Sequence, residues 1–362
     1  MREKRVIIAG GGTAGHIFPG VAIAAELRER HPGLKIHFAI GGSTLEKRIL
    51  EREGIPFVTI RSGAWRGKSM PEKARSIGRV VRGVAESIRT VRRLRAELII
   101  GVGGYVSAPM MVAGILLRKK TLLHEQNYIP GLTNRLLAPL VDEIAVSFPD
   151  TARYLHGRGA WTGNPIRKGF GAPFPTPRGE DGPLRLLVFG GSQGARRINE
   201  VVVGALPKLE RLPGGVEIVH STGEVDYEWV AAAHAKSTIR SRVAPFLDEM
   251  VRSYAETDLV ICRAGATSCA ELTAAGRPAI LIPLPRSAGG HQERNAEQIA
   301  RGEGAIVIPE TDLTPDRLAD AVGNLLATPG RLEKMAAASA ALGAPDAASR
   351  VADIADRLVQ AN

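Results

Sequence analysis

Short apolar runs alternate with helical stretches along the whole chain, and this pattern predicts parallel sheets. Each run is apolar at consecutive positions, as a strand requires when helices cover both of its faces. The first five predicted strands are 6–9, 36–40, 98–102, 121–123 and 144–146, and the second five are 184–189, 216–220, 259–262, 279–282 and 305–308. Strands that alternate with helices indicate an α/β fold built from doubly wound, Rossmann-like sheets.

The segment 163–183 separates the two sets of strands. It holds five prolines and five glycines in 21 residues, which is typical of a linker. We therefore expect an N-terminal domain over 1–163 and a C-terminal domain over 164–342. A helical pattern closes the chain over 343–362, and its spacing does not say on which domain that helix packs. Two domains also fit a length of 362 residues.

Residues 98–117 form a run of twenty uncharged residues, long enough to cross a bilayer. Glycines at 101, 103 and 104 and a proline at 109 interrupt the run. We therefore expect a buried strand over 98–102, a glycine loop and a helix over 108–117. The apolar run 6–9 near the start is too short for a signal peptide, so no targeting segment is predicted.

Composition agrees with a soluble globular protein. Hydrophobic residues make up 44% and charged residues 23% of the chain, which excludes wholesale disorder. Two cysteines, Cys262 and Cys269, are too few for a disulfide framework and predict a reduced, cytosolic protein.

The net charge of +11 is placed unevenly. Residues 1–163 contain 26 Lys and Arg against 13 Asp and Glu, whereas residues 164–362 contain 22 against 24. Residues 61–95 alone carry eleven basic and two acidic residues. Such a stripe indicates a polyanion, nucleic acid or an anionic membrane as a partner, and the charge by itself does not decide between them.

Three glycine-rich loops follow predicted strands, at 10–15, 101–105 and 190–195. The first has the Gly-x-Gly-x-x-Gly spacing at which backbone N–H groups and a helix N-terminus receive phosphate. An NAD enzyme would also need a carboxylate at the end of the second strand, and residues 39–42 contain none. The loops therefore favour phosphate binding over an NAD-dependent oxidoreductase. A tight turn without a ligand is the alternative.

Polar side chains stand where two of the predicted strands end. His16 follows the first glycine loop, where the positive end of a helix favours the neutral imidazole that a general base needs. A purely structural role beside the loop is the alternative. The run His-Glu-Gln-Asn at 124–127 follows the strand 121–123 and is positioned to face the same crevice.

In the second half, the strand 259–262 runs into a glycine turn and a helix. Free N–H groups at 266–268 could bind a diphosphate, and Glu271, one turn into the helix, could accept from a ribose diol. Ser268 and Glu271 also have the spacing of a capping box, which would make both residues structural. No His-x-x-His, Cys-x-x-Cys or Asp-x-Asp pattern occurs, so we expect neither a protein-held metal nor a cofactor.

Seven motifs in this order resemble the MurG family of bacterial glycosyltransferases, and together they cover nearly the whole chain. They are 11–16 with Pro19, 103–109, 124–127 with Gly131 and Asn134, 162–167, 190–195, 262–266 through Glu271, and His291, Gln292 and Asn295. The family adds N-acetylglucosamine to undecaprenyl-diphospho-N-acetylmuramoyl-pentapeptide, converting lipid I into lipid II in peptidoglycan synthesis. The resemblance implies an inverting UDP-N-acetylglucosamine transferase.

The resemblance also implies an architecture, in which two Rossmann-like domains face a cleft in the GT-B arrangement. The N-terminal domain would receive the lipid-linked acceptor at the membrane. The C-terminal domain would bind the UDP-sugar, and the last helix, about 343–362, would cross back onto the first domain.

The family's site residues map onto this chain motif by motif. The implied donor-binding positions are Thr13, Ala14, Gly15, Asn127, Arg167, Ser192, Leu247, Ala266, Thr267, Ser268, Cys269, Ala270, Glu271 and Gln292. The implied acceptor-diphosphate positions are His16, Gly104, Tyr105 and Asn134. For the catalytic base we favour His16, with Glu125 as its rival, and the resemblance does not decide between them.

The chain departs from the family pattern at three places. Ala14 stands where many relatives have Gly, and Ala264 stands where Ser is common. The stretch 70–95 lacks the aromatic residues expected of a membrane-touching patch. Its apolar positions, which we expect to pack on the sheet, are Ile77, Val81, Val84, Ile88 and Val91.

The expected partners are UDP-N-acetylglucosamine, the lipid-linked acceptor and an anionic membrane surface. We expect peripheral attachment at the cytoplasmic face of the bacterial inner membrane, where basic residues meet anionic lipid. Another GT-B UDP-sugar transferase is the nearest alternative. A nucleic-acid-binding protein is a more distant one, because no nucleic-acid motif or interleaved aromatic residues accompany the basic stripe.

Overall fold

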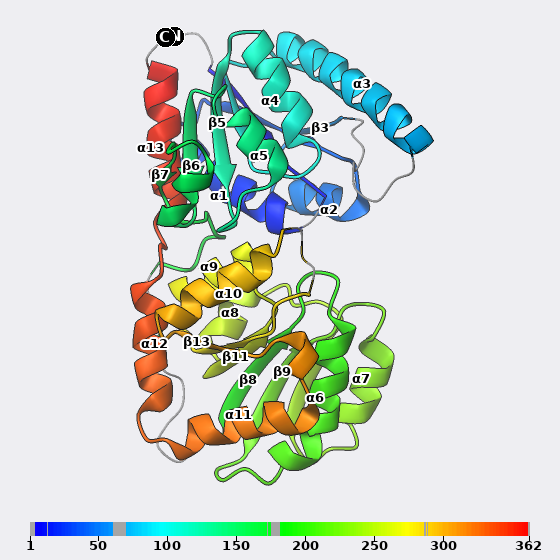
Figure 1. The fold of residues 1–362 in the computed structure, drawn as a ribbon, viewed down its shortest axis with the longest axis vertical. Coiled ribbons are helices and arrows are strands. Elements are labelled where there is room, and N and C mark those ends of the chain that lie inside the picture. The colour runs from blue at the N-terminus through cyan, green and yellow to red at the C-terminus, as the bar shows by residue number, and fades with distance from the viewer. Residues whose placement is uncertain are drawn as a thin grey trace. The chain divides into compact units, whose positions relative to one another are not determined.

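The computed structural model describes residues 4–12, 14–60, 70–171, 173–174, 182–285, 287 and 289–360, with the backbone alone for residue 14 and residues 70–80. The chain divides into two compact units (Figure 1). Unit 1 consists of Met1–Lys168 together with Asp346–Asn362, and unit 2 consists of Gly169–Pro345.

Unit 1 is built on a parallel sheet of seven strands in the order β3-β2-β1-β4-β5-β6-β7. The strands are β1 (Arg5–Ala9), β2 (Lys35–Ile40), β3 (Phe57–Thr59), β4 (Leu98–Gly101), β5 (Lys120–Glu125), β6 (Glu143–Val146) and β7 (Ala160–Trp161). The helices are α1 (Ala14–Arg30), α2 (Thr44–Arg52), α3 (Met70–Leu94), α4 (Ser107–Leu116), α5 (Leu132–Leu137) and α13 (Ala347–Gln360).

Alternate residues of β1 show why both faces of this sheet must be covered. Val6 and Ile8 are buried in the cluster that contains α1 and α13. Ile7 and Ala9 are buried in the opposite cluster, with Val91 of α3 and residues of α4 and α5. Successive side chains of a strand point to opposite faces, so a run without polar residues needs helices on both sides.

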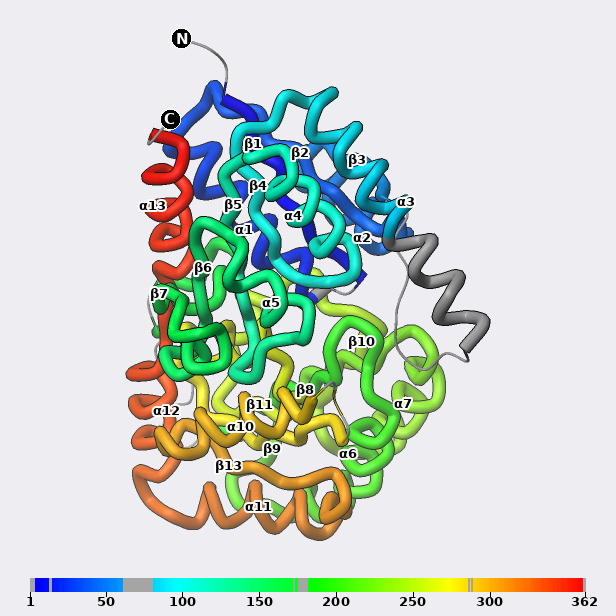
Figure 2. The backbone as a smooth tube through the Cα atoms, turned by 45° about the horizontal axis from the view of Figure 1, so that its top comes forward, coloured from blue at the N-terminus to red at the C-terminus, as the bar shows by residue number. Residues whose placement is uncertain are grey.

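The helix α13 returns to unit 1 although it lies at the other end of the sequence (Figure 2). Val351, Ile354 and Leu358 lie in the same buried cluster as α1. At its edge, the Arg30 guanidinium of α1 lies 2.6 Å from Asp353 and 3.2 Å from Asp356. These two carboxylates and Glu26 raise the pKa of Arg30 against the opposing effect of burial. The helix is therefore part of the core of unit 1.

Unit 2 repeats the plan with six parallel strands in the order β10-β9-β8-β11-β12-β13. The strands are β8 (Leu184–Phe189), β9 (Val216–Ser221), β10 (Arg240–Ala244), β11 (Leu259–Cys262), β12 (Ala279–Leu281) and β13 (Ala305–Val307). The helices are α6 (Arg196–Leu209), α7 (Tyr227–His234), α8 (Met250–Ala255), α9 (Ala266–Ala274), α10 (His291–Arg301), α11 (Pro315–Ala327) and α12 (Arg331–Ala341).

The α/β fold class is confirmed, and a strand lies at each of the ten predicted positions. Three further strands were not predicted: β3, β7 and β10. Each is an outermost strand of its sheet, and β10 carries two arginines and a serine among its five residues. Strands at an edge need no continuous apolar run, so hydrophobic patterning does not reveal them.

The predicted packing of 70–95 on the sheet is wrong at Val81, whose side chain is 63% exposed. The prediction is confirmed at Val91, which is buried in the cluster that contains Ile7 and Ala9 of the sheet, and α3 also packs against α4. The prediction for Ile77 lies outside the described side chains. Within the described residues, no helix is long and apolar enough to span a membrane.

Candidate functional site

Each sheet has one place where the strand order reverses direction, and the loops that follow the strands there flank a crevice. In unit 1 this place lies between β1 and β4, which pair through Ala9 and Gly101 at their carboxyl ends. In unit 2 it lies between β8 and β11, which pair through Phe189 and Cys262. Open α/β sheets bind ligands at such switch points. The predicted glycine loops therefore stand at the expected position in both units.

The two glycine loops of unit 1 touch backbone to backbone. Gly104 has a φ of 81°, and a Cβ atom there would lie 2.0 Å from the carbonyl oxygen of Gly11. An L-residue would therefore be strained at this position and would also collide with the neighbouring loop. The side chain of Tyr105, next in the chain, is 55% exposed beside this contact.

His16 lies in the first turn of α1, with its ring against the second glycine loop. A Cβ atom at Gly103 would come within 2.8 Å of Cδ2 of His16 and 3.2 Å of its Nε2. The close approach requires a glycine and holds the imidazole beside the loop 103–105. His16, Gly104 and Tyr105, which the resemblance assigns together to the acceptor diphosphate, therefore lie on adjoining loops. Thr13 lies outside the described residues, and so does the side chain of Ala14.

Glu46 organises the first glycine loop, and sequence reasoning missed it. Its carboxylate is 2% exposed and accepts hydrogen bonds from the N–H groups of Gly12 (2.6 Å), Gly42 (2.7 Å) and Ser43 (2.7 Å). Ser43 and Glu46 form a capping box at the start of α2. That Ser-x-x-Glu spacing was the signal that could have revealed it. The same carboxylate thus ties α2 to the loop 10–12.

Glu125, the second candidate for the catalytic base, accepts hydrogen bonds from the loop that follows β5. It is 3% exposed and accepts from the backbone of Asn127 (2.9 Å), the backbone of Gly131 (3.2 Å) and the amide of Asn134 (2.7 Å). Burial raises the pKa of Glu125, while these hydrogen bonds act in the opposite direction. Both carboxylate oxygens are engaged, so the geometry presents Glu125 as the organiser of the loop 126–134. Asn134 is 8% exposed and donates into this network.

His124 belongs to the motif 124–127 and Arg167 to the motif 162–167, and their side chains have different surroundings. His124 is fully buried beneath the carbonyl oxygen of Gly163, 3.2 Å from its Nε2, and burial lowers the pKa of His124 to about 4. It is therefore neutral at pH 7. The Arg167 guanidinium stacks on the ring of Phe18, 4.2 Å from its centroid. Arg167 is thereby held beside α1, within unit 1.

In unit 2, the loop 190–195 is folded against the turn that follows β9. Gly194 has a φ of 74°, and a Cβ atom there would lie 2.0 Å from the carbonyl oxygen of Thr222. The amide of Asn199 fastens this turn by donating to the same oxygen at 2.9 Å. Ser192, within this loop, is half-buried. Unit 2 therefore repeats the backbone contact that joins the glycine loops of unit 1.

The start of α9 overturns the capping-box alternative. The helix begins at Ala266 with Gly265 as its N-cap, and no side chain caps it. Ser268 is the third residue inside the helix, so it is not the N-cap that a capping box with Glu271 would require. A helix N-terminus without a side-chain cap is the setting in which backbone N–H groups bind phosphate. Glu271 is 3% exposed in the second turn of this helix.

Further predicted residues of unit 2 lie in and around α9, α10 and the segment after β10. Gln292, in α10, accepts from the backbone of Leu284 at 2.9 Å. Leu247 is buried, with 6% of its surface exposed. Burial raises the pKa of Cys269 to about 12, which keeps it an uncharged thiol next to Ala270. Ala264, where the family often has Ser, is buried and accepts from the Asn295 amide through its carbonyl oxygen.

Among the described residues, no group of three or more His, Cys, Asp or Glu side chains could hold a metal ion.

Comparisons with known proteins agree with this arrangement of paired α/β sheets and glycine loops. Residues 6–146 match the model of the glycosyltransferase family 28 N-terminal domain, and residues 185–357 match that of the family 28 C-terminal domain. The molecule is thus a glycosyltransferase of the GT-B class, with one sheet for each family domain.

Similarity to three individual proteins identifies the family within this class. A UDP-N-acetylglucosamine--N-acetylmuramyl-(pentapeptide) pyrophosphoryl-undecaprenol N-acetylglucosamine transferase of Syntrophus aciditrophicus is 43% identical, over 96% of this chain and 97% of that relative. One of the same name from Syntrophotalea carbinolica is 41% identical, over 96% and 97%. The crystal structure of Acinetobacter baumannii MurG superimposes with a TM-score of 0.79 at 27% identity, covering 98% of this chain and 99% of that one. The chain belongs to the MurG family.

We predict that Glu46→Gln destabilises unit 1, because the amide NH₂ of Gln would face at least one backbone N–H that the carboxylate now accepts. The expected loss in the free energy of unfolding is about 1–3 kcal/mol. Urea unfolding followed by circular dichroism measures it. Glu51→Gln, at an exposed position of the same helix, is the matched control and should change stability by less than about 0.5 kcal/mol. Equal stability of the two variants would show that Glu46 does not organise the loop.

Proposed function

We propose that this chain transfers N-acetylglucosamine from UDP-N-acetylglucosamine to undecaprenyl-diphospho-N-acetylmuramoyl-pentapeptide, with inversion at the anomeric carbon. The observation that carries the proposal is near full-length similarity, at 41–43% identity, to relatives named for that reaction. The site adds a physical reason, since each unit has a glycine loop and a helix start suited to a phosphorylated molecule.

The donor belongs in unit 2 in this proposal. The N-terminus of α9 lacks a side-chain cap, and the positive end of its helix dipole attracts a diphosphate such as that of UDP. Negative charge develops on that diphosphate as the sugar departs, and preorganised N–H donors stabilise it without reorganising. Glu271 and Gln292 are the side chains that we assign to the ribose and the sugar. Backbone groups near Leu247 would recognise the uracil.

The acceptor belongs in unit 1 in this proposal. The glycine loops beside His16 and Tyr105 would hold its diphosphate. Transfer with inversion requires a base that removes the proton of the acceptor hydroxyl. We assign that role to His16, because Glu125 already accepts hydrogen bonds at both carboxylate oxygens. Glu125 would act indirectly, as the residue that shapes the loop carrying Asn127.

We expect Glu271→Ala to weaken donor binding by roughly tenfold or more, because a buried carboxylate that accepts from a ribose hydroxyl makes a charge-assisted hydrogen bond. Titration calorimetry with UDP-N-acetylglucosamine measures the affinity, and thermal melting monitors the fold. Glu228→Ala, at an exposed position on α7, is the control in the same unit. Donor affinity equal to that of the control would remove Glu271 from the site.

His16→Ala should lower turnover by about 10²–10⁴-fold while donor affinity stays nearly unchanged, since general-base catalysis contributes factors of that size. The assay uses labelled UDP-N-acetylglucosamine and a short-chain acceptor lipid in detergent. His16→Gln is the informative companion, because Gln can hydrogen-bond but cannot take up a proton. If His16→Gln kept wild-type turnover, the residue would be a packing or hydrogen-bonding group and not the base.

We further propose that unit 1 attaches peripherally to an anionic, cytoplasmic membrane surface. Its sequence carries the basic excess, and its helix α5 leaves Leu132 and Leu136 exposed by 70% and 65%, four residues apart on one helix face. Leu140, just beyond, is 59% exposed. Exposed apolar side chains on a positively charged unit are suited to the headgroup boundary of an anionic bilayer.

Replacing both Leu132 and Leu136 by Ser should therefore reduce sedimentation with phosphatidylglycerol vesicles by roughly tenfold, with detergent-phase transfer activity retained. The reduction follows from the apolar area no longer inserted into the bilayer. Leu342→Ser, an exposed leucine of unit 2, is the control. Unchanged vesicle binding, or tight binding of duplex DNA at physiological salt, would contradict a membrane role for this surface.

A further inference from the structure

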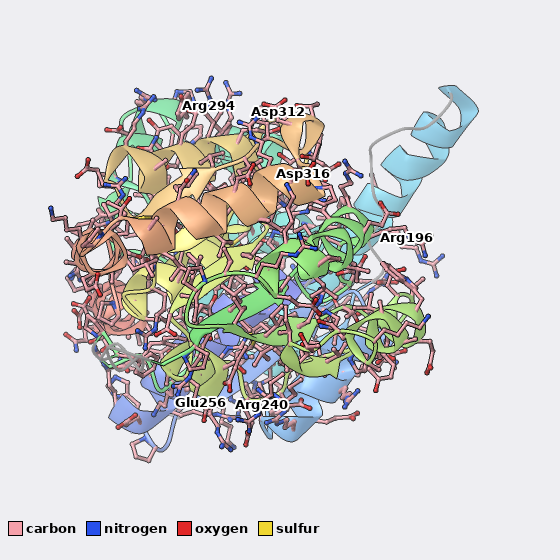
Figure 3. All side chains as sticks on the ribbon, turned by 90° about the horizontal axis from the view of Figure 1, so that it is seen from below. Arg196, Arg240, Glu256, Arg294, Asp312 and Asp316 are labelled. Carbon is pink, nitrogen blue, oxygen red and sulfur yellow. The ribbon has the colours of Figure 1, made fainter. Side chains whose placement is uncertain are left out.

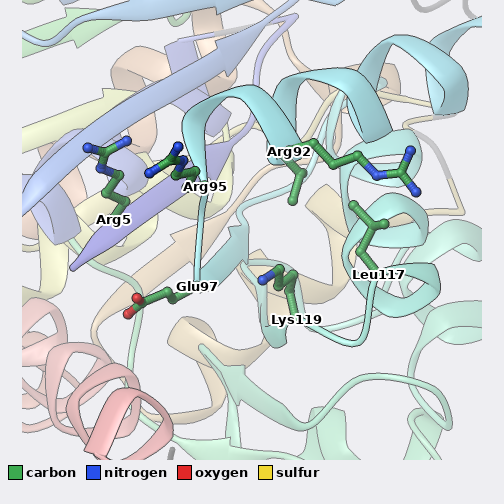
Figure 4. A pocket seen from close by; sticks show the side chains of 7 residues that line it. Arg5, Arg92, Arg95, Glu97, Leu117 and Lys119 are labelled. Atoms are coloured by element: carbon green, nitrogen blue, oxygen red, sulfur yellow. The ribbon is translucent and has the colours of Figure 1, made fainter. Parts of the chain in front are cut away.

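Unit 1 contains a basic pocket that the proposed reaction does not use. It has a volume of about 570 Å³ and is lined by Arg5, Val91, Arg92, Arg95, Glu97, Leu117 and Lys119 (Figure 4). These residues lie where β1, β4 and β5 begin and where α3 and α4 end. Four of the seven side chains are cationic and one is anionic. We call this hollow the amino-edge pocket.

Three of the four cations of this pocket, Arg92, Arg95 and Lys119, have no acidic partner among the described residues. Arg5 donates to the carbonyl oxygen of Leu94 at 3.3 Å. Among the described residues, no carboxylate lies within ion-pair distance of Arg92, Arg95 or Lys119. Unit 2 differs, since Arg252 and Lys208 each lie 2.7 Å from a carboxylate. Figure 3 shows charges of both signs over that unit, including Arg196, Arg240, Glu256 and Asp316.

The positive charges at this edge affect the pKa of a neighbouring histidine, His37. His37 lies on β2, the strand that pairs with β1 next to Arg5. Burial lowers the pKa of His37, and the charges of Arg5, Lys35 and Arg93 lower it further. Four cations around a single carboxylate, Glu97, repel one another, and this repulsion destabilises the folded state.

The backbone at Arg95, in the same pocket, is strained. Arg95 follows α3 with a φ of 50°, a left-handed conformation in which Gly or Asn is the usual residue after a helix. The chain thus carries an arginine where a smaller residue would fit with less strain. Strain of this kind points to a function for the side chain that adopts it.

The amino-edge pocket is separate from the reaction site. Arg5 begins β1, whereas the glycine loop follows Ala9 at the opposite end of that strand. Five residues of extended strand span roughly 15 Å at about 3.3 Å each. A ligand at this edge would therefore not compete with substrates at the carboxyl ends of the strands.

We propose that the amino-edge pocket binds a phosphate-bearing anion with two or more negative charges. Figure 4 shows Arg5 and Arg95 on one side and Arg92 extending toward Leu117 on the other, so the cations suit charges that are spread apart. Guanidinium groups pair with phosphate through two parallel N–H donors. Val91 and Leu117 supply an apolar wall for the group that carries the phosphate. The source is either a soluble phosphate compound or the headgroups of anionic lipid.

The test compares the full-length double variant Arg92→Gln/Lys119→Gln with Lys47→Gln/Arg48→Gln, which removes two exposed charges from α2 in the same unit. Inorganic pyrophosphate is titrated by calorimetry in saturating UDP, which occupies the donor site. The pocket variant should bind pyrophosphate roughly tenfold more weakly than the control or lose one binding site. Glu97→Gln should bind it more tightly than wild type. Thermal melting confirms that each variant is folded.

Vesicles of 30% phosphatidylglycerol in phosphatidylcholine then separate the two sources. Loss of vesicle binding in the pocket variant relative to the control identifies lipid headgroups, and loss of pyrophosphate binding alone identifies a soluble compound. The proposal is overturned if the pocket variant binds both probes as the control does. Transfer activity in detergent should be equal in all these proteins, so the outcome is independent of the proposed reaction.

Discussion

Close contact between backbone segments that lack side chains is the constraint on which both candidate sites depend. In unit 1 the carbonyl oxygen of Gly11 would lie 2.0 Å from a Cβ atom at Gly104, and in unit 2 that of Thr222 would lie 2.0 Å from a Cβ atom at Gly194. A single methyl group at either position would push the two loops apart. Both loops of unit 1, and the loop 190–195 of unit 2, follow strands at the switch points, so these contacts fix how closely their backbone N–H groups can approach a phosphate.

Buried carboxylates hold these loops in place in unit 1. Glu46 and Glu125 are each at most 3% exposed, and each accepts backbone N–H groups from a loop at the carboxyl edge of the sheet. Burying a carboxylate is costly unless hydrogen bonds replace its hydration. The cost is offset because each carboxylate satisfies several donors that the irregular loop would otherwise leave unpaired. A residue type that suggests catalysis therefore serves here as a structural ligand for the backbone.

The fold was largely predictable from the sequence, and the site only in part. Continuous apolar runs such as 98–102 revealed the central strands, because a strand covered on both faces has no polar alternation to obscure it. The edge strand β10 was not predicted, because Arg240 and Arg242 interrupt its apolar pattern. At α9, Ser268 and Glu271 matched a capping box by spacing alone. The actual N-cap, Gly265, was decided by the tight turn after β11, which short-range spacing does not encode.

The basic side chains of the protein differ in whether an acidic side chain lies beside them. In unit 2 the basic side chains Arg196, Lys208 and Arg252 each have an acidic partner, so these charges are balanced locally. In unit 1, Arg30 is similarly matched by acids on α13 and contributes to holding that helix. In the amino-edge pocket, by contrast, Glu97 is one acid among four cations. Arg92, Arg95 and Lys119 lie at the edge of the sheet opposite the glycine loops, so this part of the basic excess of unit 1 is separate from the chemistry at its switch point.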